Sequence, residues 1–306
     1  MTTQEIEALR KKYYNATLRE LKEIQPGLWI FRIQPDAGIP KFKPGQYTTL
    51  GMGMWEGCVE GNAPETLRPG DEKKLLRRAY SMSHPVLNPK TGKLYTPREI
   101  DFVEFYITLV LVGGTTPTPP RLTPRLFTLK PGARLSFGPK VTGHYTIEGI
   151  QPTDSMVFFS TGTGEAPHNA MIWKLLTEGH KGPIVSCVCT RKRSDQAYRP
   201  LHEKLQTMHS NYKVIYIATR EENEPKMYCQ DLLTRGILEQ KGNLKLNPAN
   251  THVYMCGNPS MIGRPEEKEG QKIYPKPAGL IELLEQKSFT IHTLQKHGNI
   301  HFEAYW

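Results

Sequence analysis

The feature of this sequence that most constrains its fold is an apolar strand that runs through a glycine turn into a helix. The strand reads SMVFFS, the turn is Thr161-Gly162-Thr163-Gly164, and the helix begins with Glu165-Ala166-Pro167. Glycines let backbone N–H groups approach a pyrophosphate closely, and the N-terminus of a helix adds a positive field. The turn therefore predicts a dinucleotide site at the carboxyl end of a parallel strand. A turn without a ligand is the alternative, because Pro167 replaces the third glycine of the usual motif and Glu165 would repel phosphate unless it points away.

Residues 152–306 alternate between strands and helices. The runs GPIVSCVCT, YKVIYIAT and THVYMCG read as strands, and helices are expected at about 199–210 and in AGLIELLEQKSF. This alternation is typical of βαβ units. We therefore predict an α/β domain with a parallel, Rossmann-like sheet over 152–306.

Residues 25–151 have a different character. Short runs rich in β-branched and aromatic residues are separated by Gly and Pro, and they read LWIFRIQ, GQYTTLGM, RRAYSMSH, DFVEFYITLVLV and ARLSFGPK. Such spacing predicts an antiparallel β-barrel domain. Polar stretches near 57–74 and 88–99 read as surface insertions, whose role the sequence leaves open. Residues 1–24 are expected to form a mainly helical N-terminal extension, so the 306-residue chain is predicted to have two domains.

Three cations follow the second strand of the predicted parallel sheet. They are Arg191, Lys192 and Arg193. In a dinucleotide fold this strand end meets the adenosine ribose, where an acidic residue selects NAD and an arginine accommodates the 2′-phosphate of NADP. We predict NADP, with a solvated basic loop as the alternative.

Composition narrows the chemistry further. The five cysteines include no C-x-x-C pair, so we expect no metal centre and packed thiols at Cys187 and Cys189. A redox centre would have to be a bound organic cofactor. The net charge of +10 attracts anions of any kind and does not choose among nucleic acid, membrane and acidic protein. No apolar run approaches ~20 residues and no apolar leader opens the chain, so we expect a cytoplasmic protein without membrane insertion.

Five short motifs occur in a fixed order along the chain. They are Phe42-Lys43-Pro44-Gly45-Gln46-Tyr47, Arg78-Ala79-Tyr80-Ser81, the glycine turn with Ala166-Pro167, Cys256-Gly257-Asn258-Pro259, and the terminus Phe302-Glu303-Ala304-Tyr305-Trp306. From about Leu28 to its end the chain resembles the ferredoxin/flavodoxin–NADP reductase family, specifically the bacterial type that ends in Tyr-Trp. The sequence contains no motif of aromatic residues that would stack on bases, so we expect no nucleic-acid partner.

The resemblance implies an enzyme that transfers hydride between NADP(H) and FAD and exchanges single electrons with ferredoxin or flavodoxin, which are small acidic carriers. It also implies the ligand contacts, and we expect a monomer. The FAD residues implied are Arg78, Ala79, Tyr80, Ser81, Ile107, Leu109, Arg121, Leu122, Thr123, Tyr305 and Trp306. The NADP residues implied are Thr161, Gly162, Thr163, Gly164, Ala166, Pro167, Arg191, Lys192, Arg220, Cys256, Gly257, Asn258 and Pro259.

Four residues, Ser81, Cys256, Glu303 and Tyr305, are expected to act in catalysis by the same resemblance. Ser81 would lie near flavin N5, and Cys256 would lie beside nicotinamide C4, although core packing is the alternative for this thiol. Glu303 would relay protons or stabilise the semiquinone, with a solvated charge as the alternative. Tyr305 would cover the flavin face opposite Tyr80 and move aside for the nicotinamide, and Trp306 would reach the adenine.

One departure from the family pattern affects the coenzyme prediction. Relatives often carry an arginine where this chain has Gln230, and Arg220 or Lys226 could replace it. An NADH-linked flavin reductase or oxygenase reductase of the same superfamily is therefore the nearest alternative. A basic nucleic-acid-binding module and a flavin- or nucleotide-sensing protein without catalysis are the others.

Overall fold

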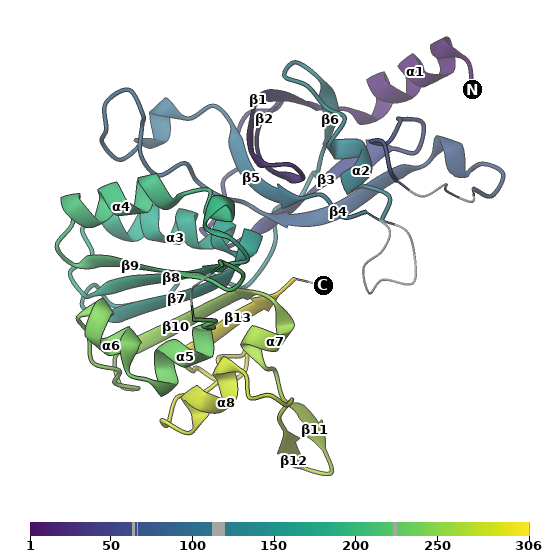
Figure 1. The fold of residues 1–306 in the computed structure, drawn as a ribbon. Coiled ribbons are helices and arrows are strands. Elements are labelled where there is room, and N and C mark those ends of the chain that lie inside the picture. The colour runs from purple at the N-terminus through teal and green to yellow at the C-terminus, as the bar shows by residue number, and fades with distance from the viewer. Residues whose placement is uncertain (63–64, 66, 112–119, 223–224, 306) are drawn as a thin grey trace. The chain divides into compact units, whose positions relative to one another are not determined.

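A computed structural model describes residues 1–62, 65, 67–111, 120–222 and 225–305 (Figure 1). The chain divides into two compact units. The first comprises Met1–Pro85 and Tyr95–His144, and the second comprises Val86–Leu94 and Tyr145–Trp306. These limits differ from the domain limits 25–151 and 152–306 expected from the sequence, which stay a prediction.

The first unit is built on a six-stranded antiparallel sheet. Its strands lie in the order β4-β3-β6-β1-β2-β5. An isolated antiparallel bridge between Ser83, just after β4, and Glu104 of β5 joins the two outer strands. The sheet is thereby closed into the predicted barrel. The strand bounds are β1 Ala16–Gln25, β2 Leu28–Pro35, β3 Tyr47–Gly53, β4 Leu75–Ser81, β5 Val103–Thr108 and β6 Arg134–Phe137.

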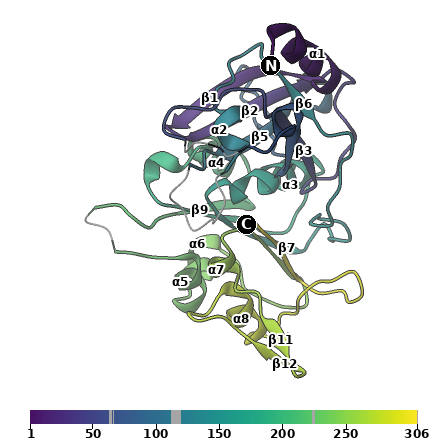
Figure 2. The ribbon, with the colours of Figure 1, turned by 90° about the vertical axis from the view of Figure 1, so that its right-hand side faces the viewer.

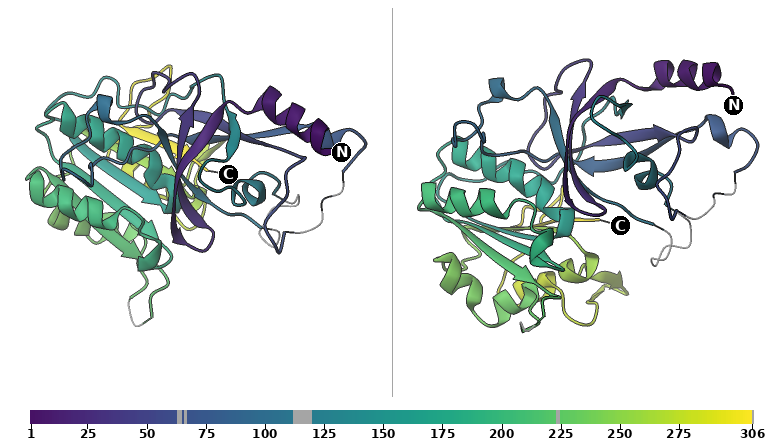
Figure 3. Two further views of the ribbon diagram at one scale, coloured as in Figure 1. Left: turned by 90° about the horizontal axis from the view of Figure 1, so that it is seen from above. Right: turned by 45° about the horizontal axis from the view of Figure 1, so that its top comes forward.

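The expected helical extension is correct only for its first half. Helix α1, Thr3–Tyr13, begins with a capping box between Thr2 and Glu5 and lies beside the barrel strands (Figure 1, Figure 3). Residues 16–25 instead form β1, which pairs with β2 through a two-residue turn at Pro26-Gly27, where Gly27 has φ 80°. Proline followed by glycine with positive φ suits a type II turn. Ala16 and Leu18 of β1 are buried in the core of the first unit.

The second unit contains a five-stranded sheet in the order β13-β10-β7-β8-β9. All of its neighbouring strands are parallel. The chain runs outward from β7 to β8 and β9, then returns to the other side of β7 with β10 and β13. The strand order therefore reverses between β7 and β10, as in doubly wound folds. The bounds are β7 Ser155–Thr161, β8 Ile184–Thr190, β9 Tyr212–Ala218, β10 Thr251–Gly257 and β13 Ile300–Ala304.

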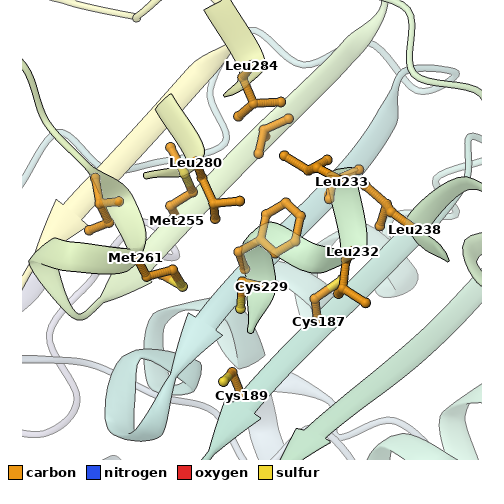
Figure 4. Packing of buried hydrophobic residues seen from close by; sticks show 14 of the residues in the cluster. Cys187, Cys189, Cys229, Leu232, Leu233, Leu238, Met255, Met261, Leu280 and Leu284 are labelled. Atoms are coloured by element: carbon orange, nitrogen blue, oxygen red, sulfur yellow. The ribbon is translucent and has the colours of Figure 1, made fainter. Parts of the chain in front are cut away.

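Helices cover both faces of this sheet (Figure 1). On one face lie α3, Glu165–Thr177, and α4, Arg199–Met208, which pack through Met171, Ile172 and Leu205. The other face is covered by α5 Cys229–Thr234, α6 Ile237–Gly242 and α8 Leu280–Glu285 (Figure 4). Cys187 and Cys189 are buried in the core between the sheet and these three helices, as predicted from the sequence.

The structure also contains two short helices and a hairpin. Helix α2, Thr123–Leu126, belongs to the first unit, and α7, Pro259–Ile262, follows β10. The hairpin of β11 Glu266–Lys268 and β12 Gln271–Ile273 lies beside α8 (Figure 2). Within the described residues, no helix is both long and apolar enough to cross a membrane.

Candidate functional site

The glycine turn of the second unit packs directly against the end of β10. Gly162 has φ 52°, and a Cβ added to Gly164 would lie 2.2 Å from the carbonyl oxygen of Cys256. Gly257 has φ 122°, and a Cβ there would lie 2.2 Å from Thr161 Oγ1. These approaches require glycine, because any side chain would push the two segments apart.

Hydrogen bonds hold the same two segments together. The backbone N–H of Asn258 donates to Thr161 Oγ1 at 2.7 Å. Asn258 Oδ1 accepts from Ser260 N at 2.8 Å and caps α7, with Pro259 as the first helical residue. The structure therefore brings the two predicted NADP motifs together where the strand order reverses, the usual ligand position in open α/β sheets. Thr163, Gly164, Ala166 and Pro167 are buried at the start of α3.

The predicted 2′-phosphate residues lie at the ends of β8 and β9. Thr219 N donates to Thr190 O at 3.0 Å, and Arg220 N donates to Arg191 O at 2.8 Å. The backbones of Arg191 and Arg220 are therefore adjacent in space, and Lys192 follows Arg191 directly. All three residues are exposed. Gln230 lies on α5, and its amide donates toward the carbonyls of Ser260 and Ala278 at 3.4 and 3.5 Å.

Cys256 and Glu303 face each other on adjacent parallel strands. In register, Cys256 pairs with Glu303 of β13 on one side and with Ser160 of β7 on the other. Tyr305 continues this alignment, because its N–H donates to Gly257 O at 3.0 Å. Burial, followed by the charge of Glu303, raises the pKa of the Cys256 thiol well above its usual value. The thiol is therefore neutral at physiological pH.

Two further residues of this region were not predicted from the sequence. The Tyr145 hydroxyl and His168 Nε2 are 2.7 Å apart and both side chains are buried. Burial is the main factor that raises the pKa of Tyr145, and the carboxylate of Glu303 and the thiol of Cys256 add to it. Burial lowers the pKa of His168 to about 3. A tyrosine and a histidine 23 positions apart form no sequence pattern that could have revealed this pair.

In the first unit, the predicted FAD motif lies on β4. Arg78 and Ala79 are exposed, Tyr80 is half-buried and Ser81 is buried. Burial of Tyr80 raises the pKa of its hydroxyl. On β4, Tyr80 pairs in register with Thr48 of β3, and on β5 Ile107 pairs with Trp29 of β2.

The turn at Arg121-Leu122-Thr123 lies next to the end of β5. Leu109 N donates to Gly27 O at 2.7 Å, and the following Val110 N donates to Thr123 Oγ1 at 3.1 Å. Leu122 is buried, whereas Arg121 and Thr123 are partly exposed. The structure therefore brings the chain just after β5 next to this turn. Trp306 lies outside the described residues.

Arg125, another residue that was not predicted from the sequence, holds this turn in place through its buried side chain. Its side chain is only 4% exposed and forms a bidentate ion pair with Glu65 of the 57–74 stretch. The same guanidinium donates to Glu56 O at 3.1 Å, to Arg121 O at 2.7 Å and to Met54 O at 3.4 Å. All five of its N–H groups are thus used. Through Glu65, the polar stretch is therefore attached to the turn at Arg121 by the side chain of Arg125.

No group of three or more potential metal ligands exists among the residues that the structure describes. The candidate sites of the two units instead present backbone N–H groups, guanidinium groups and aromatic rings. The N–H and guanidinium groups suit phosphates, and the aromatic rings suit planar rings.

Comparisons with known proteins agree with this geometry. Residues 158–266 match the family model described as the oxidoreductase NAD-binding domain. The chain is 27% identical to the flavodoxin/ferredoxin–NADP reductase of Buchnera aphidicola from Schizaphis graminum, over 90% of this chain and 93% of that protein. It is also 27% identical to the ferredoxin–NADP reductase of Pseudomonas aeruginosa, over 86% of this chain and 92% of that protein. The resemblance noted from the ordered motifs is confirmed.

Solved structures share the fold over nearly the whole chain. A ferredoxin–NADP⁺ reductase of Neisseria gonorrhoeae with bound FAD and NADP has a TM-score of 0.68 at 20% identity, covering 96% of this chain and 98% of that one. The flavohaem-like FAD/NAD-binding domain of the Vibrio cholerae nitric oxide dioxygenase has a TM-score of 0.60 at 14% identity, covering 96% and 99%. Both likenesses concern the fold.

Proposed function

We propose that this chain is a ferredoxin/flavodoxin–NADP⁺ reductase, which transfers hydride between NADP(H) and FAD and exchanges single electrons with an acidic ferredoxin or flavodoxin. The observation that carries the proposal is the junction of the glycine turn with Cys256-Gly257 where the sheet reverses its strand order. Its close backbone approaches suit a dinucleotide, and the relatives that carry this enzyme name match most of the chain.

FAD supplies the conversion between two-electron and one-electron chemistry when it is bound. The exposed guanidinium of Arg78 can pair with its pyrophosphate, and the ring of Tyr80 can stack on its flavin. Ser81 offers a hydroxyl next to this ring. The backbone of Ile107 and Leu109 and the turn at 121–123 provide the remaining contacts in the first unit.

The second unit is proposed to hold NADP(H). The turn from Thr161 to Pro167 would receive the pyrophosphate at the N-terminus of α3. Arg191, Lys192 and Arg220 would receive the 2′-phosphate. A hydrogen bond to a charged group contributes roughly 1.5–3 kcal/mol, so two such bonds favour NADP over NAD by about two to four orders of magnitude.

The residues at the ends of β10 and β13 are proposed to position the nicotinamide. Because its pKa is raised, the Cys256 thiol acts by contact and orientation rather than as a nucleophile. Glu303 is proposed to hold or move a proton, and Tyr305 to yield its place to the nicotinamide. A role of Trp306 at the adenine, a monomeric state and a cytoplasmic location stay predictions.

An NADH-linked flavin reductase or oxygenase reductase is the second candidate. Gln230 favours it, because it stands where relatives often carry an arginine for the 2′-phosphate. The cluster of Arg191, Lys192 and Arg220 favours the first candidate.

Steady-state kinetics with purified flavodoxin and plant-type ferredoxin as acceptors separate the two. We expect kcat/KM for NADPH to exceed that for NADH by about a hundredfold or more, with reduction of at least one carrier. Equal use of NADH, or reduction of free flavin without reduction of either carrier, would favour the second candidate.

A further inference from the structure

Glu165 is the first residue of α3, directly after the glycine turn, and its side chain is buried. Its carboxylate is 2% exposed, and Oε1 lies 3.1 Å from Nε2 of His202, a fully buried residue of α4. Among the described residues, this oxygen has no hydrogen bond of good geometry. The carboxylate thus points into the unit, away from solvent, and the imidazole is the nearest group that could neutralise it.

The surroundings of His202 can accept either protonation state of its ring. Nε2 lies 3.0 Å from Asn169 Oδ1, an acceptor, and Nδ1 lies 2.6 Å from the Tyr212 hydroxyl. In the neutral ring Nε2 carries the proton and Tyr212 donates to Nδ1. In the charged ring Nδ1 donates instead, and the Tyr212 hydroxyl can turn toward Ser186, which also contacts it. A proton can therefore be added without losing a hydrogen bond.

The other groups that face the pair are mostly uncharged. From α3 comes His168, whose pKa burial lowers to about 3, so that it is neutral above that pH. From β9 come the hydroxyls of Tyr212 and Tyr216, whose pKa values are raised by burial. Tyr198, just before α4, contributes its ring, and α4 contributes the ion pair of Arg199 with Glu203, whose charges compensate each other. The net charge at this point is thus set by Glu165 and His202.

A carboxylate at the first residue of α3 would compete with a pyrophosphate bound at the glycine turn. Both anions are stabilised by the same positive field at the N-terminus of α3, and they repel each other across a poorly polarisable interior. A proton taken up by the pair of Glu165 and His202 would reduce its negative charge by one unit and weaken this repulsion. By reciprocity, a ligand that binds more tightly to the protonated protein raises the protein's affinity for that proton.

We propose that Glu165, acting through His202, is a positioning residue that couples pyrophosphate binding at the glycine turn to uptake of one proton by this buried pair. The inference rests on the proposed function, since it concerns the affinity of the same NADP(H) site. The protein, the dinucleotide and one proton combine into a complex in which the pair holds the added proton, and no bond between heavy atoms changes.

Calorimetric titration of the purified flavoprotein with NADP⁺ between about pH 6 and about pH 9 tests the coupling. Glu165→Gln keeps the shape of the side chain and removes its charge. The ratio of the wild-type Kd to the Glu165→Gln Kd should be near one at the acid end and rise about tenfold toward the alkaline end. Titration of the ligand's own 2′-phosphate cancels in this ratio. Glu178→Gln, which removes an exposed carboxylate just beyond the other end of α3, should leave the wild-type pH profile unchanged.

Proton uptake provides the second readout. ADP-ribose carries the pyrophosphate and no group that titrates in this range, and its binding heat in two buffers of different ionisation enthalpy gives the protons bound by the protein. Wild type should take up part of a proton and Glu165→Gln none. Parallel pH profiles for wild type and Glu165→Gln would overturn the inference alone, as would wild-type binding of ADP-ribose without proton uptake, a result that needs no variant to fold. Failure of wild type to bind NADP⁺ at any pH would overturn the proposed function and the inference together.

Discussion

Arg77 and Arg78 are adjacent on β4, so their side chains leave opposite sides of the strand. Arg77 lies 3.5 Å from Ser136 Oγ of β6, whereas the Arg78 side chain bonds only to the neighbouring Arg77 carbonyl in the described contacts. We expect Arg78→Ala to raise the Kd for FAD about ten- to a hundredfold, the loss of one hydrogen bond to a charged group. Flavin fluorescence on dilution of the holoprotein measures it.

Arg77→Ala is the matched control for this prediction, because it removes the same charge from the same strand. It should change the Kd for FAD by less than about threefold. Equal losses in both variants would show that net charge, and not a contact with the cofactor, is responsible.

The neutral thiol of Cys256 leads to a second prediction. Cys256→Ser exchanges sulfur for a smaller oxygen, so a nicotinamide positioned by this contact would be held less accurately. We expect kcat with NADPH to fall about tenfold or more while FAD content stays unchanged. Cys58→Ser, at a half-buried thiol of the first unit, is the control. An unaltered kcat in Cys256→Ser would show that this thiol only packs in the core and does not position the nicotinamide.

Single residues were predictable where they belong to a motif. The glycine turn, Cys256-Gly257 and the basic loop were located from the sequence because each pairs a composition with a strand end. Tyr145, His168, Arg125 and the direction of the Glu165 side chain were not, since each depends on a partner far away in the sequence. Only tertiary packing brings such partners together.

Among the elements, long strands and helices with clear periodicity were predicted, and marginal ones were not. The sequence ATLRELKEIQ is charged and looks helical, yet it forms β1 because β2 follows through a Pro-Gly turn. Strand β13, IHFEA, is short and contains polar residues, and it is identified only by its register with β10. Nonlocal pairing outweighs local propensity in both cases.

The ion pair that attaches Glu65 of the stretch 57–74 to Arg125 leads to a third prediction. Arg125→Met would leave the Glu65 carboxylate buried without its partner, which typically costs about 3–5 kcal/mol. The unfolding free energy should fall by an amount of this order, and the affinity for FAD should fall with it, because Arg125 also holds the Arg121 carbonyl. Urea unfolding and flavin retention measure the two effects.

Lys74→Ala serves as the control for Arg125→Met, since it removes an exposed partner of Asp71 within the same stretch. Its cost should stay below about 1 kcal/mol. Loss of stability without loss of FAD affinity in Arg125→Met would limit the stretch to a role in folding.

The end of the chain after β13 supports a fourth prediction. Removal of Tyr305 and Trp306 takes away the aromatic group proposed to compete with the nicotinamide, so both coenzymes should gain access. We expect kcat/KM for NADH to rise and the NADPH/NADH ratio of kcat/KM to fall. An unchanged ratio in the truncated enzyme would contradict the gating role.

Over the whole molecule, buried histidines make stability depend on pH. Burial lowers the pKa values of His84, His168 and His301 to about 3. An unfolded histidine titrates near 6.5, so the unfolded chain binds more protons between these values, and stability falls as pH decreases through this range. Each histidine contributes up to about 1.4 kcal/mol per pH unit.

His168→Phe should therefore reduce the slope of unfolding free energy against pH between about pH 6.5 and about pH 5, whatever its effect at neutral pH. Urea unfolding at several pH values measures this slope. An identical slope in wild type and His168→Phe would indicate that His168 is not held neutral in the folded protein.

The proposed function requires one unit to hold FAD and the other to hold NADP(H). The visible absorption spectrum of the purified protein, recorded before and after anaerobic addition of stoichiometric NADPH, tests this claim most directly. We expect one non-covalent FAD per chain and loss of the oxidised flavin absorption on addition of NADPH. A colourless protein that stays colourless after incubation with excess FAD, or a bound flavin that NADPH does not bleach, would contradict it.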